Sequence, residues 1–346
     1  MTEQCPFFGL CGGCAFQDMP FDAYLKMKAD HVRDALARKA IDAPIDPIIS
    51  IPDQTRRRVT FAYAPGVFGF NEKKSHRLIN ISTCRLLVPE LQAFIQPLKA
   101  LSQKIGGTGH VAVLMTDIGA DIAFLTDAPK GKKKKACRKT ASVESGRPSV
   151  DLLEDISVFC QTLPVVRFVL NGDLIFQAVQ MDIPSNVFLQ PSVLGEETLV
   201  RLVLDGVQGA HSVLDLFCGL GTFTVPMHAA GLRVKGYDIT AESIAALQKK
   251  GVPAEVRDLF RQPLTSTELD AADAVVLDPA RAGADAVCRQ LAESNVPKVV
   301  MVSCHPGTFA RDARTLLNGG YRLVRVTPVD QFIFSTHIEL VGVFEK

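Results

Sequence analysis

Two short motifs in the C-terminal half, each directly after an apolar run, constrain the fold most strongly. Asp278-Pro279-Ala280-Arg281 follows the run 274–277, and Ser303-Cys304-His305-Pro306 follows the run 299–302. Short apolar runs of this kind predict buried parallel strands. In an open α/β sheet, ligands bind outside the carboxyl ends of the strands. Cys304 is therefore placed for chemistry, and we predict that it is a nucleophile.

The preceding segments continue the same alternation of strand and helix. The apolar strand 212–217 leads into the turn Cys218-Gly219-Leu220-Gly221, and a second strand, 233–237, ends at Asp238. Glycines let the backbone approach a cofactor closely, and an acid after the second strand can accept hydrogen bonds from both ribose hydroxyls. The turn is shorter than the G-x-G-x-x-G of dinucleotide folds, so it favours a nucleoside cofactor without phosphates, such as S-adenosylmethionine. A plain strand-to-helix connection is the alternative.

The N-terminal half has a different pattern. Apolar spacing predicts a helix over 21–39, and a hinge rich in proline and aspartate follows it. Strand-like segments at 59–63, 66–70 and 78–82 predict a small antiparallel sheet, and strand signals return at 165–170 and 174–179. We place the domain boundary near Pro184, which gives domains 1–185 and 186–346.

Composition narrows the class of protein and the partner. The 346 residues are 47% hydrophobic, and we find neither a membrane-length apolar stretch nor a signal segment, so we expect a cytoplasmic protein without membrane contact. The net charge of +1 conceals basic clusters at 56–58, at 73–74 and in the exposed loop 128–149. Such clusters favour an acidic polymer such as RNA, although the lysines at 132–135 could equally form a solvated loop.

Nine cysteines are an odd number, which argues against a disulfide framework. Cys5, Cys11 and Cys14 lie in a glycine-rich knot, residues 1–18, with the spacing C-x5-C-G-G-C, and Cys84 lies in a separate polar stretch. Four thiolates make a complete ligand shell for an iron–sulfur cluster or a structural zinc. The remaining alternative is that they are unconnected small hydrophobic residues.

These motifs, in this order and spacing, resemble the RNA uracil-carbon-5 methyltransferase family. The resemblance runs from Cys5 to the C-terminus and includes the segments Cys5–Cys14 with Gln17, Cys84, Phe188–Pro191, Asp215–Gly219, Asp278–Ala284, Val302–Pro306 with Ala310–Asp312, and His337–Glu339. It implies an α/β chain, with a C-terminal Rossmann-like methyltransferase domain and an N-terminal iron–sulfur and α+β RNA-binding domain. The implied cofactors are S-adenosylmethionine and a [4Fe–4S] cluster on the four cysteines named above.

The resemblance also implies site residues and a product, 5-methyluridine in RNA. Cys304 would be the nucleophile, Glu339 the base and Asp278 a further catalytic group. The cofactor or the target base would contact the glycine turn and a set of side chains, which together comprise Gln190, Phe217, Gly219, Gly221, Asp238 and Asp278. The separate roles of Asp258, Arg281 and His337 stay open.

The chemistry explains these residue types. Carbon 5 of uracil is a poor nucleophile, so a thiolate first adds to carbon 6, and a carboxylate later removes the carbon-5 proton. Cys304 would need a lowered pKa, which a helix start near Thr308 would favour.

The nature of the RNA is less constrained. The chain starts at the cysteine knot, without the N-terminal OB-like domain of many relatives, as in the shorter ribosomal members. This favours 23S ribosomal RNA, with transfer RNA kept open, and a monomeric enzyme.

Other functions fit the same residues less well. An amino-group methyltransferase would carry an aromatic residue in the motif at 278–281, and a DNA cytosine methyltransferase lacks the cysteine knot. A non-catalytic iron–sulfur protein that binds RNA or senses redox state is the alternative outside the enzymes.

Overall fold

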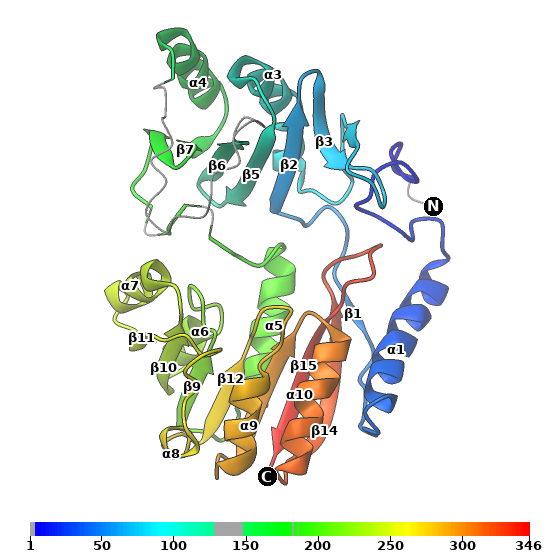
Figure 1. Cartoon of the computed structure of the whole chain (residues 1–346), viewed down its shortest axis with the longest axis vertical. Helices are drawn as coiled ribbons and strands as arrows, with labels where there is room; N and C mark the ends of the chain where they lie inside the picture. The colour runs from blue at the N-terminus through cyan, green and yellow to red at the C-terminus, as the bar shows by residue number, and fades with distance from the viewer. Residues whose placement is uncertain (1–3, 128–147, 182, 186) are drawn as a thin grey trace, which may run out of the picture. The chain divides into compact units, whose positions relative to one another are not determined.

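The computed structural model describes residues 4–127, 148–181, 183–185 and 187–346, and the chain forms two compact units (Figure 1). The first unit comprises Met1–Gly13 and Arg56–Met181, and the second comprises Cys14–Thr55 and Asp182–Lys346. This differs from the predicted division in one long segment, because residues 14–55 belong to the second unit. The predicted basic stretch at 132–135 lies outside the described residues.

The first unit is built on a seven-stranded sheet in the order β4-β3-β2-β5-β6-β7-β8. Neighbouring strands are antiparallel except for the parallel pair β6 and β7. The strands are β2 (Arg58–Ala64), β3 (Val67–Asn71), β4 (Leu78–Asn80), β5 (Gly109–Thr116), β6 (Gly119–Thr126), β7 (Val165–Leu170) and β8 (Asp173–Gln177). The predicted antiparallel strands β2, β3 and β4 are confirmed, whereas the central hairpin β5–β6 was not predicted.

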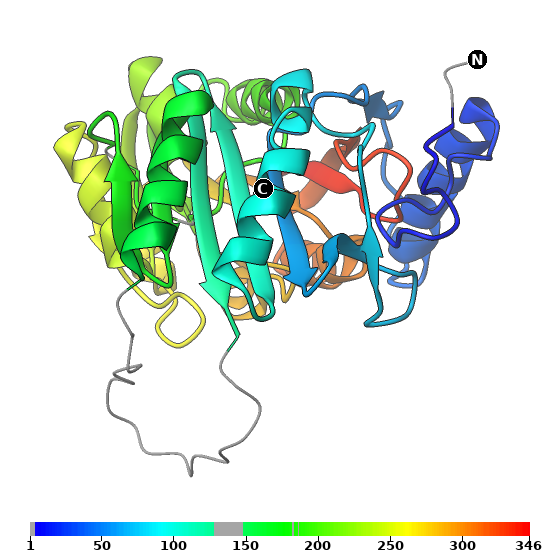
Figure 2. The same cartoon turned by 90° about the horizontal axis from the view of Figure 1, so that it is seen from above.

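Helices cover one face of this sheet. Apolar residues of α3 (Ile95–Ile105) and α4 (Val150–Thr162) share a buried core with side chains of β2, β5, β6 and β7, and both helices lie along the sheet in Figure 2. The single turn α2 (Pro89–Gln92) precedes α3 and contributes Leu91 to the same core.

The second unit is built on an eight-stranded sheet in the order β1-β14-β15-β13-β12-β9-β10-β11. Five neighbouring strands, β13-β12-β9-β10-β11, run parallel, as the alternating pattern predicts. The strands are β1 (Ile49–Ser50), β9 (Ser212–Leu216), β10 (Arg233–Asp238), β11 (Ala254–Val256), β12 (Ala274–Leu277), β13 (Lys298–Ser303), β14 (Arg322–Asp330) and β15 (Glu339–Glu345).

Both faces of this sheet are covered by helices, as parallel strands require. One core contains residues of α1 (Phe21–Ala37), α9 (Asp285–Glu293) and α10 (Pro306–Asn318), and another contains residues of α5 (Val193–Gly206) and α6 (Thr224–Ala229). Helix α7 (Ala241–Lys249) packs against β10 and β11, and α8 (Ser266–Leu269) packs against α9. Residues 14–55 join this unit because α1 packs against α10 and β1 pairs with β14.

Strand direction explains how the site is assembled. The parallel strands end at one edge of the sheet, and the residues after β9, β10, β12 and β13 emerge there. Strand β15 is antiparallel to its neighbours β13 and β14, so it begins at that same edge. Leu340 pairs with Ser303, and Glu339 pairs with Val329. Topology therefore brings Glu339 next to the residue that follows Ser303, which is Cys304.

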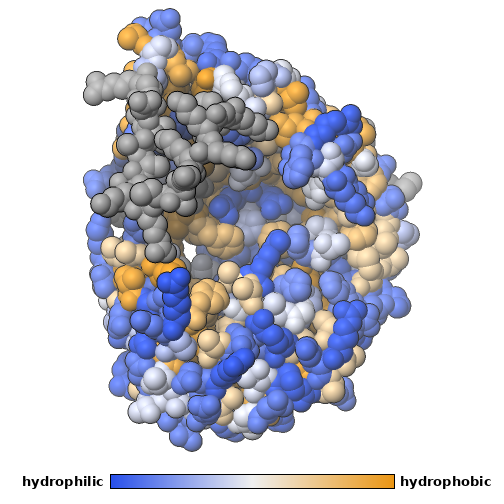
Figure 3. Space-filling view, viewed as in Figure 1, coloured by the Kyte–Doolittle hydropathy of each residue, from blue (hydrophilic) through white to orange (hydrophobic). Residues whose placement is uncertain are grey.

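The surface of the second unit is largely polar on the face shown in Figure 3, where hydrophobic residues are scattered among hydrophilic ones. In the described part of the chain, no helix combines the length and the apolar character needed to cross a membrane.

Candidate active site

The glycine turn after β9 is shaped by its own backbone bonds. Phe217 and Gly219 have positive φ angles of 67° and 53°. The Gly219 N–H donates to Asp238 Oδ2 at 3.0 Å, and the Gly221 N–H donates to the Cys218 carbonyl at 2.8 Å. A Cβ on Gly219 would meet no atom within 4 Å, so open space lies beside the backbone there. The turn therefore offers the close backbone approach that a cofactor needs.

Gly221 is required for a different reason. Its φ is 90°, and a Cβ at this position would lie 2.4 Å from Leu247 Cδ2. This residue therefore allows the turn to pack against α7.

Asp238 is held at the end of β10 with both carboxylate oxygens hydrogen-bonded. Oδ2 accepts the bond from Gly219, and Oδ1 accepts from the Thr240 N–H at 2.8 Å. Each carboxylate oxygen can accept a second hydrogen bond. Asp238 can therefore bind a hydroxyl while it orders the turn.

Three large apolar side chains remain exposed at or just after the ends of β10 and β11. Ile239, Val256 and Phe260 expose 58%, 50% and 49% of their surface. The Phe260 ring lies 5.2 Å from the Phe217 ring, centroid to centroid. Exposed apolar groups beside polar ones at a strand edge are typical of ligand sites.

Two carboxyl groups, the buried Asp215 and the half-buried Asp278, lie at the ends of β9 and β12. Asp215 is fully buried, accepts a hydrogen bond from Thr224 Oγ1 at 2.5 Å, and has no partner for Oδ1 among the described residues. Burial, opposed by hydrogen bonds from Thr224 and aided by the nearby Asp278 and Asp238, raises the pKa of Asp215 to about 7. Burial also raises the pKa of Asp278 to about 7. This edge of the sheet therefore disfavours additional negative charge and would favour a cationic ligand.

Cys304 follows β13 and precedes α10, which begins at Pro306. His305 caps this helix, because its Nδ1 accepts a hydrogen bond from the Thr308 N–H at 3.2 Å. The predicted lowering of the Cys304 pKa is wrong for this structure. Burial raises the pKa of the thiol, and Glu339 and Asp278 raise it further, while Arg281 lowers it. Desolvation and two carboxyl groups outweigh the helix dipole, so the thiol is protonated at rest.

Glu339 is buried at the start of β15, with 6% of its surface exposed. Burial and, to a smaller extent, Asp278 raise its pKa to about 8, although Gln331 and Arg281 oppose the shift. Gln331 Nε2 donates to Glu339 Oε1 at 3.3 Å and to Gln190 Oε1 at 3.0 Å. The Gln331 amide therefore links two residues that the sequence had assigned to the site.

Arg281 and His337 are brought together, since Arg281 Nη2 lies 3.4 Å from His337 Nε2. Arg281 also acts electrostatically on both Cys304 and Glu339. Asp258 has a local role, because its Oδ1 accepts hydrogen bonds from the N–H groups of Phe260 and Arg261 within its own turn.

The N-terminal cysteines are divided between the units. Cys5, Cys11 and Cys84 belong to the first unit and Cys14 to the second. Burial raises the pKa of Cys11, and the nearby Cys5 contributes to this rise. Cys11 Sγ accepts a hydrogen bond from the Gly13 N–H at 3.4 Å. Within the described ranges, no three His, Cys, Asp or Glu residues are grouped so that they could hold a metal ion. The donor set suits a thiolate cluster chemically, but the structure does not show the assembled shell.

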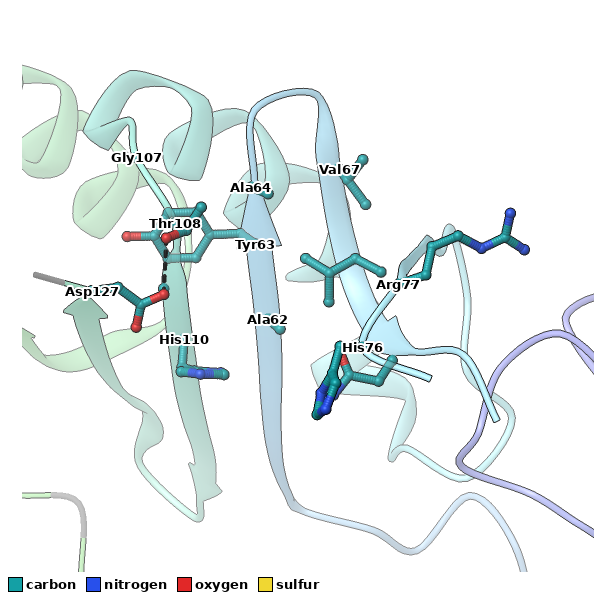
Figure 4. Close-up of a pocket in the computed structure, with 13 residues that line it drawn as sticks. Ala62, Tyr63, Ala64, Val67, His76, Arg77, Gly107, Thr108, His110 and Asp127 are labelled. Atoms are coloured by element: carbon teal, nitrogen blue, oxygen red, sulfur yellow. Dashed lines mark hydrogen bonds between the residues drawn. The ribbon is translucent and has the colours of Figure 1, made fainter. Parts of the chain in front are cut away.

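The first unit also contains a cavity of about 1010 Å³ that is lined by none of the predicted site residues. Its lining comes from β2, β3, β5 and the turn before β4, and it includes two histidines, His76 and His110 (Figure 4). Thr108 and Asp127 lie at one side, joined by a hydrogen bond of 2.9 Å. The buried Tyr63 hydroxyl has no partner among the described residues. All residues that line this cavity belong to the first unit.

Known proteins resemble the chain in both sequence and fold. Residues 254–346 match the family model described as tRNA (Uracil-5-)-methyltransferase. An RNA methyltransferase of Caulobacter vibrioides is 37% identical, and the match covers 100% of this chain and 86% of that protein. The 23S rRNA (uracil(1939)-C(5))-methyltransferase RlmD of Salmonella paratyphi A is 28% identical, with 100% of this chain and 82% of that protein covered.

A solved structure shares the fold across almost the whole chain. The tRNA (uracil-54, C5)-methyltransferase of Pyrococcus abyssi, in complex with S-adenosyl-L-homocysteine, matches with a TM-score of 0.72 and 21% identity. The match covers 99% of this chain and 88% of that one. Parallel strands, the glycine turn and this likeness define a methyltransferase fold. The chain belongs to the RNA uracil-carbon-5 methyltransferase family.

Sequence reasoning did not find several residues that shape this site. Gln331 was missed because it has no motif of its own, although it lies eight residues before Glu339. Phe260 looked like an ordinary loop residue. Lys28 and Tyr24, which contact the segment before Glu339, lie about 300 residues away in the sequence. Only the fold brings them to this segment.

Proposed function

We propose that the protein transfers a methyl group from S-adenosylmethionine to carbon 5 of a specific uridine in RNA, through a covalent adduct with Cys304. The observation that carries this proposal is the meeting of Cys304, Glu339 and Asp278 at one strand edge. Glu339 and Asp278 both act on the Cys304 thiol, and Asp278 acts on Glu339. A nucleophile and an acid–base group within one small site is the arrangement that covalent catalysis on a ring requires.

The cofactor fits the part of this strand edge that is formed by the glycine turn, residues 217–221. The open space at Gly219, the carboxylate of Asp238 and the exposed apolar groups Ile239 and Phe260 suit a nucleoside with a ribose and a flat base. S-adenosylmethionine, when bound, supplies an electrophilic methyl group on a cationic sulfonium. The unpaired buried oxygen of Asp215 and the acidic character of the edge favour such a cation. The relative from Pyrococcus abyssi was crystallised with the corresponding product.

In the proposed mechanism, the protein's groups act in sequence on one base. Cys304 releases its proton to solvent, with Arg281 stabilising the thiolate, and its sulfur forms a bond to carbon 6 of uracil. The electron pair of the 5,6 double bond moves toward carbon 5 and oxygen 4. Carbon 5 then forms a bond to the methyl carbon while the bond between that carbon and the sulfonium sulfur breaks, which would leave S-adenosylhomocysteine. Glu339 then accepts the carbon-5 proton, the double bond re-forms, and the bond between sulfur and carbon 6 breaks. Glu339 releases this proton to solvent, and the departing thiolate takes up a proton from solvent, which restores the resting thiol.

Ionisation of Glu339 controls the last step. With a pKa of about 8, this carboxyl is mostly protonated at neutral pH in the protein without RNA. A protonated carboxyl cannot accept the carbon-5 proton, so adduct resolution should become faster as the pH rises toward about 8. The Gln331 amide favours the ionised form of Glu339 because it donates a hydrogen bond to it.

The target base must leave its stack, because a thiol at a strand edge cannot reach carbon 6 inside a paired helix. We favour 23S ribosomal RNA as the substrate, on the basis of the Salmonella relative that acts on it and matches over the full chain. The alternative is transfer RNA, on which the Pyrococcus relative acts.

A direct test uses both RNAs with purified enzyme and labelled methyl donor. We expect 5-methyluridine in a 23S fragment and none in transfer RNA. With 5-fluorouridine at the target position, the enzyme should remain covalently attached through denaturing electrophoresis, because fluorine cannot leave as a cation. Methylated RNA without any trapped complex would contradict the Cys304 adduct, and methylation of transfer RNA alone would reverse the substrate assignment.

We also propose a [4Fe–4S] cluster on Cys5, Cys11, Cys14 and Cys84. The chemistry of the donor set and the proximity of Cys5 to Cys11 support it. No catalytic step is assigned to this cluster.

Protein purified without oxygen should be brown and hold about four irons per chain, as a four-thiolate cluster requires. Cys84→Ser should lose the iron, whereas Cys160→Ser, at a buried cysteine of α4, should keep it. Stoichiometric zinc without iron would contradict the assignment.

A further inference from the structure

Helix α1 carries an unusual buried face. Its buried residues, Tyr24, Lys28, Val32, Ala35 and Leu36, follow helical spacing, but the two nearest its N-terminus are polar. Lys28 exposes only 2% of its surface. A lysine is rarely buried so completely, because removal of its charge from water is unfavourable unless every N–H finds a partner. A leucine at this position would extend the apolar face without that penalty.

All three donors of the Lys28 ammonium are directed to one short segment. Lys28 Nζ forms an ion pair with Asp330 Oδ1 and donates to the carbonyl of His337 at 2.6 Å and to that of Phe332 at 3.5 Å. Asp330 is the last residue of β14 and is fully buried. An ammonium has three N–H donors, so this set of partners accounts for each of them. One side chain of α1 therefore holds both ends of the segment that joins β14 to β15.

Tyr24 adds a second set of contacts one turn earlier on the helix. Its hydroxyl donates to Asp330 Oδ2 at 2.6 Å and accepts from the Phe334 N–H at 2.9 Å. The Ala15 N–H, just before α1, donates to the Phe334 carbonyl at 2.7 Å. Phe334 has a positive φ of 63°, which a non-glycine residue adopts only when its surroundings hold it there. The segment is thus fixed at both ends and in the middle.

This segment, residues 331–338, presents the groups that surround the proposed base. Gln331 bonds to Glu339 and Gln190, and His337 contacts Arg281. The charged groups that act on Glu339 are Asp278 and Arg281 after β12, and Glu339 in turn acts on Cys304 after β13. None of these groups bonds to α1 directly, so α1 would act on them only through residues 331–338.

We propose that Lys28, Tyr24 and Asp330 are positioning residues that hold residues 331–338 in the conformation in which Gln331 orients Glu339 for removal of the carbon-5 proton. This inference rests on the proposed function. It assigns to an N-terminal helix, far in sequence from the motifs that contain Cys304 and Glu339, control over the resolution of the Cys304 adduct. It also explains why an ion pair replaces apolar packing here, since directional bonds fix a loop where non-directional burial would not.

The test compares four variants of the full-length protein. Lys28→Met with Asp330→Asn removes both charges together, so that neither is left buried alone. Lys28→Met alone removes only the cation. Tyr24→Phe keeps the ion pair between Lys28 and Asp330 but loses the hydrogen bonds of the Tyr24 hydroxyl to Asp330 and Phe334. Lys26→Met is the matched control, because Lys26 lies on the same helix with 75% of its side chain exposed.

Two measurements separate anchoring from catalysis. Hydrogen exchange of the amides in 331–338, without RNA, should accelerate by at least about tenfold in the double variant, and less in Tyr24→Phe. Exchange in β9 and β10 should match the wild type. In single-turnover reactions, the methylated adduct should resolve at least about tenfold more slowly, with its pH midpoint shifted upward, while the dissociation constant for S-adenosylmethionine stays within about twofold. Lys26→Met should behave as the wild type in both.

Unchanged exchange in 331–338 would overturn the proposal. Faster exchange with normal adduct resolution would also overturn it, because the network would then be structural only. If the double variant does not fold, hydrogen exchange and adduct resolution are measured in Tyr24→Phe instead, and the same outcomes support or overturn the proposal. A wild-type enzyme that methylates no RNA would refute the proposed function itself. If the wild type methylates RNA and the double variant resolves its adduct at the normal rate, only the proposed role of α1 is refuted.

Discussion

The candidate site at the strand edge of the second unit has two parts, the glycine turn and the loop before β15, and different kinds of groups hold them together. On the turn side, residues 217–221 and Asp238 are joined mainly by backbone groups over short sequence distances. On the loop side, residues 331–339 and Cys304 are joined by side chains that come from separate elements, including α1. The turn side needs small residues and a fixed backbone, whereas the loop side needs buried titratable groups held in place.

The difference matters for chemistry. On the turn side the amides do not titrate, so pH acts there only through carboxyl groups such as Asp238 and Asp215. Buried carboxyl and thiol groups shift one another's pKa, so their function depends on which of them carries a proton. Changes on the loop side should therefore alter reaction steps and pH dependence, and changes on the turn side should alter cofactor binding and stability.

The largest expected effect is on the loop side. Cys304→Ala removes the group that adds to carbon 6, so RNA methylation should fall by at least about 10³-fold. No covalent RNA complex should form on denaturing gels. Binding of S-adenosylmethionine, measured by calorimetry, should remain near the wild-type value, because the turn is untouched. If Cys304→Ala still methylates RNA, the assignment of Cys304 as the nucleophile is wrong.

Glu339→Gln should slow turnover by about 10²- to 10⁴-fold, since it removes the proposed proton acceptor. Addition and methyl transfer should still occur. A methylated enzyme–RNA adduct should therefore accumulate and be visible by denaturing electrophoresis with labelled methyl groups. If the variant instead releases unmethylated RNA and forms no adduct, Glu339 acts before methyl transfer and not after it.

The turn side offers a matched pair of glycine substitutions. Gly221→Ala places a methyl group 2.4 Å from Leu247 Cδ2 at a positive φ, so it should lower the free energy of unfolding by about 2–4 kcal/mol. Gly219→Ala meets open space, so only the strain of its positive φ should destabilise it, by about 1–2 kcal/mol. Urea denaturation measures both. Gly219→Ala should nevertheless weaken S-adenosylmethionine binding. Equal stability losses in the two variants would contradict the packing described for Gly221.

The smallest expected effect is a pH dependence of stability. The Glu339 pKa rises from 4.5 to about 8 on folding, so between these values the folded protein holds a proton that the unfolded chain releases. The contribution of Glu339 to stability is therefore fully present below about pH 4.5 and is lost as the pH rises toward 8. Glu339→Gln lacks this titration. The stability of the wild type relative to the variant should fall by more than about 1 kcal/mol across the window. Parallel curves would mean that Glu339 is ionised in the folded protein.

Much of the second unit could be predicted because its signals are local. Apolar runs identified β9, β10, β12 and β13, and the glycines at 219 and 221 identified a turn whose backbone angles the structure confirms. The hairpin β5–β6 and the parallel pairing of β6 with β7 were not predicted, because pairing partners are set by the whole sheet. The Cys304 pKa was predicted in the wrong direction, because the helix start was visible in the sequence and the neighbouring carboxyl groups were not.

The sequence by itself therefore determined the α/β fold class of the second unit, the order along the chain of the strands that carry motifs, and the residue types at the ends of those strands. These features depend on periodicity and on residues close together in the chain. The tertiary structure decided which of them meet. The antiparallel direction of β15 brings Glu339 beside Cys304, and α1 reaches the segment before Glu339 through Lys28 and Tyr24. Burial then sets the protonation of these groups, because desolvation and the charges of distant residues act only after the chain has folded.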